Sequence, residues 1–498
     1  MSVAFAPLVD NLGAAGDPIE AVARFLDLPF LLFLDSATGS APAGESHQLG
    51  RYSFLTADPA RVVRSKGSLT EIGGPGGAWT PVAADPLAVV RELLEPFAAE
   101  PVSGLPPFQG GAAGYIGYDY GAVLERLPAA RYDDLAIPDV VLGIYDWVIA
   151  WDHRLGTAWI VSTGLPETGG ERAVRAAERL AMVRERLRGP ARPAPRAAAH
   201  PRAPSPVAEA PSYPVLGVEG AVPVGLRSTF THRGYLDAVT RVRDYIVAGD
   251  IFQANLSQRF QAPLTEPPFD LYVRLRRGNP AAFAAYGDFG ELCVLSASPE
   301  RFLRLDQNGR HVETRPIKGT RPRGLGPMHD AALGRALAES DKDRAENVMI
   351  VDLLRNDLSR VCRPGTVRVP ELFALEQHPT VHHLVSTVVG ELDPAADAIA
   401  LLRAAFPGGS ITGAPKVRAM EIIAELEPSR RGVYCGSVGY LSTTGAMDTS
   451  IVIRTYLALR GRVYFQAGGG IVADSDPELE YRETLDKARA LIGALAGP

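Results

Sequence analysis

The sequence predicts an α+β fold in which β-sheets and helices form layers. Strand-like and helix-like segments are mixed along the chain, without the regular strand–helix–strand alternation of a doubly wound parallel sheet. The first 165 residues hold mainly short apolar runs between Gly and Pro turns, which is typical of sheet-rich structure. A chain of 498 residues exceeds the usual size of one domain, so we expect two lobes or one large composite domain.

The first lobe is expected to span residues 1–188. It contains strand-like runs such as Val140–Ile144 and ends in a helix rich in Arg and Glu at about 170–188. Residues 189–214 are rich in Pro, Ala and Arg and hold almost no large apolar side chain that a core could bury. This composition predicts a linker, so residues 215–498 would form a second domain.

The second domain is expected to mix helices and strands. Gly249 is suited to end a helix whose apolar residues follow helical spacing, namely Leu236, Val239, Val242 and Ile246. Later helices are expected at about 343–361, 416–427 and 477–496. Two strands, at about 449–459 and 463–467, meet at Arg460-Gly461 and predict a hairpin.

Composition excludes several classes of function. Hydrophobic residues make up 46% and charged residues 22% of the chain, as in an ordinary globular protein. The net charge of −6 gives no general attraction to nucleic acid or to acidic membranes. Three widely spaced cysteines predict neither a disulfide framework nor a zinc site, and no apolar run is long enough to span a membrane. We expect a cytoplasmic protein with no nucleic-acid partner.

Lys318 is the most informative single residue. Only five of the 51 Lys and Arg residues are lysines, so lysine should stand chiefly where arginine cannot replace an amine. Three arginines lie close to Lys318 in the sequence, and their charge would favour a neutral, nucleophilic amine; they are Arg315, Arg321 and Arg323. The alternative is a solvated basic loop.

Three glutamates form a candidate metal site. Glu480 and Glu483 lie three residues apart on the last predicted helix, so both carboxylates project from one face. Glu346 stands near the start of an earlier helix. Mg²⁺ takes oxygen ligands and is usually held by one or two carboxylates. Ordinary acids on helix surfaces are the alternative.

Two glycine-rich segments are candidate anion sites. Gly468–Gly470 begin a GxGxxA match, but fewer than thirty residues follow, too few for a dinucleotide-binding unit. Adjacent backbone N–H groups there could still bind a carboxylate, and a tight strand-to-helix turn is the alternative. The loop 406–416 is not a Walker loop, although Thr412 and Gly413 near a helix start could bind an anion.

The remaining candidates are single side chains. Arg454 lies within an apolar strand-like run and needs a partner if buried, either a ligand carboxylate or an internal salt bridge. Glu300, beside Pro299, could be a general acid if its pKa were raised. His382 and His383 lack a Ser or Cys motif that would complete a hydrolytic triad, so one of them is expected to be a core or polar-contact histidine.

Taken together, these segments resemble the chorismate-utilising enzymes, the family of the component I proteins of anthranilate and aminodeoxychorismate synthases. The resemblance covers nearly all of the chain. It implies a large layered α/β sandwich with two β-sheets and flanking helices, and a chorismate-binding catalytic domain at 215–498. Five long motifs carry it: 249–260, 316–323, 346–358, 408–423 and 468–487. Shorter N-terminal pieces match at 34–37, 50–54 and 110–118.

The resemblance implies a role for each candidate residue. Glu346 and Glu483 would hold Mg²⁺, with Glu480 acting through water. Lys318 would attack C2 of chorismate while Glu300 protonates the departing C4 hydroxyl. The two substrate carboxylates would be held by Arg454, Lys487, Gly468, Gly469 and Gly470. The ring would be positioned by Tyr440, Thr412, Gly413 and His383.

Three positions distinguish the branches of the family. Isochorismate and salicylate synthases have a water-activating lysine where this chain has Gln253, a candidate substrate-binding residue, so water is disfavoured as the nucleophile. Lys318 and Thr412 are typical of the branch that forms 4-amino-4-deoxychorismate for p-aminobenzoate and folate, whereas anthranilate-forming enzymes tend to have Ala and Ser there. An anthranilate synthase component I with an unusual lysine is the alternative.

Two partner questions follow from the resemblance. No cysteine has the sharp Gly-flanked setting of a glutaminase nucleophile, so ammonia is expected from a separate glutamine amidotransferase subunit or from solution. The segment Leu34–Ala37, with Asp35 and Ser36, resembles the tryptophan pocket of the family but departs from the Leu-Leu-Glu-Ser form of feedback-inhibited enzymes. Whether tryptophan binds there stays open.

Overall fold

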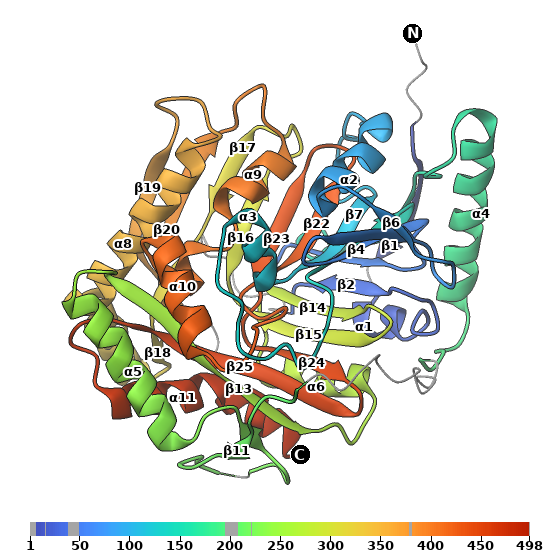
Figure 1. Cartoon of the computed structure of the whole chain (residues 1–498). Coiled ribbons are helices and arrows are strands. Elements are labelled where there is room, and N and C mark those ends of the chain that lie inside the picture. The colour runs from blue at the N-terminus through green and yellow to red at the C-terminus, as the bar shows by residue number, and fades with distance from the viewer. Residues whose placement is uncertain are drawn as a thin grey trace.

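The computed structural model describes residues 6–14, 16–37, 49–194, 208–220, 222–377 and 381–497. These residues form two large antiparallel sheets with helices around them (Figure 1). The predicted α+β layered sandwich is therefore confirmed. None of the helices within these ranges is long and apolar enough to cross a membrane.

The first sheet has 13 strands within the described ranges. In spatial order they are β1 (Leu8–Ala14), β10 (Thr157–Ser162), β9 (Trp147–Asp152), β3 (Tyr52–Thr56), β2 (Leu32–Asp35), β14 (Phe283–Asp288), β15 (Leu292–Ser298), β24 (Thr455–Leu459), β25 (Arg462–Ile471), β13 (Gln253–Pro263), β12 (Arg227–Ser228) and β11 (Tyr213–Pro214). The short strand β21 (Gly413–Ala414) also pairs with β13.

The second sheet has 12 strands in the same part of the chain. In spatial order they are β18 (Ile317–Pro322), β20 (Val381–Glu391), β17 (His311–Thr314), β16 (Arg301–Leu305), β23 (Met447–Ile451), β22 (Ser437–Ser442), β7 (Gly111–Ile116), β8 (Val140–Tyr145), β4 (Arg61–Lys66), β5 (Leu69–Gly73) and β6 (Thr80–Val82). Strand β19 (Arg368–Gln377) pairs with β20 as well.

The helices confirm the periodicity expected from the sequence. They are α1 (Pro18–Val22), α2 (Pro86–Leu94), α3 (Gly121–Leu124), α4 (Gly169–Arg188), α5 (His232–Val247), α6 (Pro268–Gly278), α7 (Pro327–Ala338), α8 (Asp341–Ser359), α9 (Ala398–Ala405), α10 (Lys416–Leu426) and α11 (Pro477–Leu495). The helices expected at 170–188, 343–361, 416–427 and 477–496 correspond to α4, α8, α10 and α11. Side-chain caps start α8 and α11, where Ser340 and Asp476 accept hydrogen bonds from backbone N–H groups.

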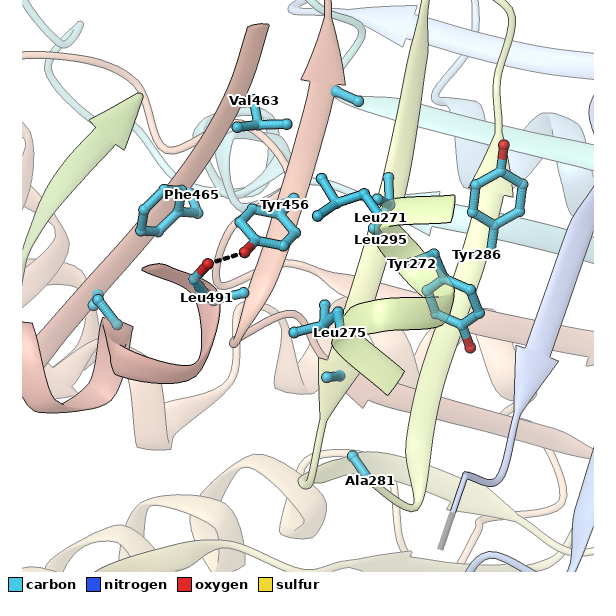
Figure 2. Close-up of a cluster of buried hydrophobic side chains, with 14 of the residues drawn as sticks. Leu271, Tyr272, Leu275, Ala281, Tyr286, Leu295, Tyr456, Val463, Phe465 and Leu491 are labelled. Carbon is cyan, nitrogen blue, oxygen red and sulfur yellow. Dashed lines mark hydrogen bonds between the residues drawn. The ribbon is translucent and has the colours of Figure 1, made fainter. Parts of the chain in front are cut away.

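Three apolar clusters give the molecule its layers. One lies between the two sheets, and the others lie under the helices on the outer faces. Figure 2 shows part of the cluster under α6 and α11, where Tyr456 of β24 donates a hydrogen bond to the Leu491 carbonyl. The core therefore contacts both faces of each sheet, as in a helix–sheet–sheet–helix arrangement.

The strand predicted at 449–459 is wrong as one element. It breaks at Val452–Arg454 into β23, in the second sheet, and β24, in the first. Arg454 has φ +51°, in the left-handed region that non-glycine residues rarely occupy, so the chain turns sharply as it passes between the sheets. The predicted hairpin at Arg460-Gly461 is confirmed by the pairing of β24 with β25.

Strands from the two predicted domains are joined in both sheets. In the first sheet β2 pairs with β14, and in the second sheet β7 pairs with β22. The boundaries at 188 and 215 stay a prediction. Of the predicted linker, residues 195–207 lie outside the described ranges.

Candidate active site

Glu300 lies between β15 and β16 and is almost fully buried, with 5% of its surface exposed. Burial raises its pKa to about 7, against the opposing influence of a hydrogen bond from Ser410 and the positive charges of Lys318 and Arg454. The Ser410 hydroxyl donates to Glu300 Oε1 at 2.7 Å. A carboxyl group with this pKa holds a proton at neutral pH that it can donate.

Lys318 projects from a bulge in edge strand β18. The pairing of β18 with β20 shifts register between Ile317 and Thr320, and Gly319 adopts φ +82° there. The bulge aims the lysine at the loop between α9 and α10, where its Nζ donates to the Ser410 carbonyl at 3.1 Å. Ser410 thus contacts both Glu300 and Lys318.

Ser410 is a site residue that sequence reasoning missed. It stands two residues before Thr412, within the 408–423 motif, but its residue type alone indicates no role. Its hydroxyl and carbonyl serve two residues that are 110 and 92 positions away in the chain, and only the fold brings these groups together.

The crowding of Lys318 by like charge, expected from the sequence, is wrong. Each neighbouring arginine has its own carboxylate partner. Arg321 binds Asp343 at 3.0 Å, Arg323 binds Asp330 at 2.6 Å, and Arg315 binds Glu376. Their positive charges are compensated within these pairs, so the environment of Lys318 is set by other groups.

The three candidate metal ligands form one electrostatic cluster, and Lys318 acts on two of them, Glu346 and Glu483. Burial raises the pKa of Glu346 on α8, and the nearby Glu483 carboxylate adds to this effect while Lys318 opposes it. Burial also disfavours ionisation of Glu483 on α11, yet the adjacent Lys487 ammonium holds its pKa below the ordinary value. The Lys487 and Glu483 charges are 2.6 Å apart.

Glu480 is the most buried of the three, with 4% of its surface exposed. Ser475 donates to its Oε1 at 2.7 Å, whereas its Oε2 is buried without a hydrogen-bond partner. Burial raises its pKa above the usual range for a carboxyl. A buried carboxylate oxygen without a partner is costly unless a cation or a donor reaches it.

Magnesium fits the chemistry of these donors. All three offer carboxylate oxygens, and a Cβ added to Gly469 would lie 3.0 Å from Glu480 Oε2 and 3.2 Å from Glu483 Oε1, so these two oxygens approach one point. Yet the residues that the structure describes contain no group of three or more His, Cys, Asp or Glu side chains arranged to hold a metal ion. Ammonium groups lie among the carboxylates instead.

Gly468–Gly470 belong to strand β25 and not to a strand-to-helix turn. They pair with Asn255, Leu256 and Ser257 of β13, while the pairing with β24 ends at Phe465. A Cβ on Gly470 would lie 2.0 Å from Gln253 Nε2, and Gln253 Oε1 is buried without a partner. Lys487 donates to the Gly468 carbonyl at 2.8 Å. The glycines therefore connect Gln253, Lys487 and the carboxylates.

Arg454 lies beside Glu300 at the crossing between the sheets. Its positive charge acts on Glu300, and burial lowers its own pKa from the ordinary value. Within the described ranges its guanidinium forms no ion pair, so it is available to a ligand carboxylate, one of the two options that the sequence left open.

Thr412, Gly413 and His383 flank this group. Thr412 is fully buried, and its hydroxyl donates to the Gly408 carbonyl of its own loop at 3.0 Å. Gly413 pairs with Ala254 of β13, one residue from Gln253. His383 of β20 is hydrogen-bonded through Nδ1 to Thr320 Oγ1 at 2.9 Å, two residues after Lys318. His382 contacts Asp330 at 2.8 Å, the polar contact expected for one of the pair.

Tyr440 lies in a different place from the Glu300 group. Its ring stacks on Phe108 with centroids 4.7 Å apart and lines a cavity of about 490 Å³ between the sheets. The same cavity is lined by Asp35 and Ser36. The Asp35 carboxylate already accepts hydrogen bonds from Tyr272 and Arg276. The structure therefore groups Tyr440 with the candidate tryptophan-binding residues.

The sequence is similar to those of known proteins over most of its length. The chorismate binding enzyme family matches residues 45–493. An aminodeoxychorismate synthase component 1 of Salmonella typhimurium is 44% identical over 451 residues, 90% of either chain. An anthranilate synthase component 1 of Cereibacter sphaeroides is 41% identical over 462 residues, 92% of this chain and 87% of the relative.

A solved structure agrees with these relatives. The crystal structure of anthranilate synthase component I from Streptococcus pneumoniae has a TM-score of 0.75 and 33% identity, and the match covers 91% of this chain and 93% of that chain. The family expected from the motifs is thereby confirmed. The chain belongs to the chorismate-binding enzyme family.

Proposed function

We propose that this chain converts chorismate and ammonia to 4-amino-4-deoxychorismate, the precursor of p-aminobenzoate and folate. The observation that carries the proposal is the placement of Lys318. Its Nζ contacts the carbonyl of Ser410, whose hydroxyl binds the protonatable Glu300. An amine and a carboxylic acid joined through one residue can act together on a single ring.

The chemistry follows from these two groups. Once the Lys318 ammonium has given up a proton, its amine forms a bond to C2 of chorismate, both ring double bonds shift, and the C4 hydroxyl leaves as water with the proton of Glu300. Ammonia then bonds to C4, the double bonds shift back, the C2–N bond to Lys318 breaks, and the new nitrogen at C4 returns a proton to Glu300. The enolpyruvyl group is retained throughout. The lysine divides one difficult displacement into two easier ones.

The other residues orient the substrate in this proposal. Arg454 beside Glu300 would hold one carboxylate of chorismate, and Lys487 with Gly468–Gly470 would hold the other. Gln253, Thr412, Gly413 and His383 would bound the ring. Glu346 and Glu483 would hold Mg²⁺, with Glu480 acting through water. Bound there, Mg²⁺ would supply positive charge to a substrate carboxylate and fix its orientation.

A separate glutamine amidotransferase subunit is proposed as the source of ammonia. The relatives' designation as component 1 supports a second component. We also propose tryptophan as a ligand of the cavity lined by Asp35 and Ser36, and the cytoplasm as the place of action, where three free cysteines stay reduced.

Anthranilate synthesis is the second candidate, favoured by the 41% identity to an anthranilate synthase component 1 and by the likeness to the Streptococcus pneumoniae structure. The two reactions differ in the carbon that receives nitrogen and in the loss of pyruvate. Lys318 favours the first, because attack at C2 by lysine leaves C4 for ammonia.

The purified chain, incubated with chorismate, Mg²⁺ and ammonium, tests the proposal. We expect 4-amino-4-deoxychorismate without release of pyruvate. Fluorescent anthranilate with pyruvate would favour the second candidate. In the absence of ammonia, mass spectrometry of the trapped protein should show chorismate less one water bound to Lys318, and Lys318→Ala should abolish this adduct.

A further inference from the structure

Lys342 is a rare lysine next to the carboxylate cluster. It stands one helical turn before Glu346 on α8, and its Nζ lies 3.9 Å from Glu480 Oε1. Its side chain is about half exposed, at 48%, so it can move into solvent without opening the core. Three of the five lysines of the chain, Lys318, Lys342 and Lys487, surround the same carboxylates.

Lys342 differs from the other two lysines in the number of carboxylates that its charge affects. It is among the main influences that favour the charged form of Glu346, of Glu480 and of Glu483 alike. Lys487, by contrast, is held by the Gly468 carbonyl and by Glu483. Among the residues that the structure describes, Lys342 has no short hydrogen bond, and its half-exposed position does not hold it in place.

The residue type fits a cation that can leave. Arginine is the usual cation of this chain, and its planar fork would bind a carboxylate through two hydrogen bonds. Lysine provides one compact charge on a flexible stem, which compensates an acidic cluster but gives way to a stronger cation. The unpartnered Glu480 Oε2 leaves part of the acidic cluster open to that cation.

We propose that Lys342 is an exchangeable counter-ion. It compensates Glu346, Glu480 and Glu483 while no divalent cation is bound and moves into solvent when the cation enters. This inference rests on the metal site of the proposed function. It adds that Lys342 competes with the cation and so weakens metal binding. In the metal-free protein, the same lysine offsets the repulsion among the three carboxylates.

Binding of Mn²⁺ to the metal-free full-length protein tests this inference, measured by electron paramagnetic resonance without chorismate. Lys342→Met removes the competitor, and we expect about tenfold tighter Mn²⁺ binding. Lys342→Arg keeps a stronger competitor and should bind Mn²⁺ no more tightly than the wild type. Arg344→Met is the matched control, because Arg344 lies on the same helix but stacks on Phe373 of β19 at 4.9 Å.

Thermal unfolding gives an independent readout. Without metal, Lys342→Met should melt below the wild type because the carboxylates repel one another uncompensated, and saturating Mn²⁺ should close this gap. Arg344→Met should show no such closure.

The outcomes separate the two proposals. If the wild type and Lys342→Met bind Mn²⁺ equally, the counter-ion role is overturned and the metal site stands. If Lys342→Met binds Mn²⁺ more weakly and raises KM for chorismate, the lysine holds substrate and the inference is likewise overturned. If neither protein binds Mn²⁺, both the metal site and the counter-ion role fall.

Discussion

At the scale of single residues, Glu300 would couple catalysis to stability in the proposed reaction. Burial raises its pKa to about 7 from the ordinary 4.5, so the folded chain keeps this proton where the unfolded chain has lost it. Between these two pH values the unfolded state binds fewer protons, and stability falls as pH rises. Glu300, the proposed proton donor, therefore lowers the stability of the fold as the pH rises, and most of this loss is reached above a pH of about 7.

Glu300→Gln should separate these two effects. We expect amination to fall at least about 100-fold, because the amide donates no proton. At pH 8 the variant should be more stable than the wild type by up to about 3 kcal/mol, whereas at pH 5 the difference should be small. Urea unfolding at both pH values measures this. Equal stability differences at pH 5 and pH 8 would contradict the raised pKa.

The neighbouring glycines of β25 should respond differently to one methyl group. A Cβ on Gly468 would lie 2.3 Å from the Leu256 carbonyl oxygen, a backbone clash, whereas a Cβ on Gly469 meets only the ends of Glu480 and Glu483. Gly468→Ala should therefore lower the melting temperature by several degrees, for a cost of about 1–3 kcal/mol. Gly469→Ala should keep the melting temperature and weaken Mg²⁺ binding. Calorimetry and Mn²⁺ titration distinguish the two; the reverse pattern would show that the carboxylates lie elsewhere.

Residue type indicated most of the candidate site residues, but contacts between distant segments did not follow from it. Lysine scarcity indicated Lys318, and the spacing of Glu480 and Glu483 placed both on one helix face. Ser410 carried no signal, because its importance comes from its contacts with Glu300 and Lys318. Tyr440 illustrates the opposite case, since its strand places the ring in another cavity.

At the scale of elements, β18 needs help to hold Lys318 in place. In the part of the chain that the structure describes, it is an edge strand paired with β20 alone, and its bulge interrupts that pairing. Asp330 of α7 supports the end of β18. It accepts hydrogen bonds from Arg323 and from the Gly324 N–H, and it contacts the buried His382 of β20 at 2.8 Å. The carboxylate thus ties the end of β18 to its one partner strand.

Asp330→Asn should misplace Lys318 without preventing substrate binding. We expect kcat to fall about tenfold, because a small displacement of a reacting group is costly, while KM for chorismate changes by less than about twofold. Steady-state kinetics and the rate of the Lys318 adduct measure the effect. Glu391→Gln is the matched control, since it breaks the half-exposed ion pair with Arg363 at the other end of β20. Equal losses in both variants would show general loosening of β20.

The break between β23 and β24 could not be predicted from residue type. Residues 449–459 are β-branched or apolar except for Ser450 and Arg454, and no Gly or Pro interrupts them. The first half of this run pairs with β16 in the second sheet, and its second half pairs with β15 in the first sheet. Arg454, between the two halves, has a left-handed backbone conformation. Pairing with distant strands, and not the local strand propensity, therefore determines where β23 ends and β24 begins. The helices were predictable because caps and apolar spacing are local signals.

At the scale of the whole molecule, the two parts of the chain on either side of residues 189–214 depend on each other. Each sheet joins strands from both parts, through β2 with β14 and β7 with β22. The cluster between the sheets likewise takes side chains from both, among them Phe54 and Val438. Neither part alone can cover these faces and edges.

Cutting the chain within the linker region tests this dependence. Residues 215–498 expressed alone should aggregate or lack a cooperative unfolding transition, because β14 and β22 lose their partners. The same fragment expressed together with residues 1–194 should restore amination, since the two parts are joined by strand pairing in both sheets. Gel filtration, thermal unfolding and the amination assay measure this. A soluble, cooperatively folded 215–498 fragment would contradict the expectation.

The position of β25 in the first sheet bears on synthesis at the ribosome. It pairs with β13, a strand made some two hundred residues earlier, and β24 alone joins β25 to β15. Until the last segment emerges, the nascent chain carries exposed strand edges that invite pairing with other chains. Production of this protein should therefore gain from slow translation and from chaperones that shield such edges.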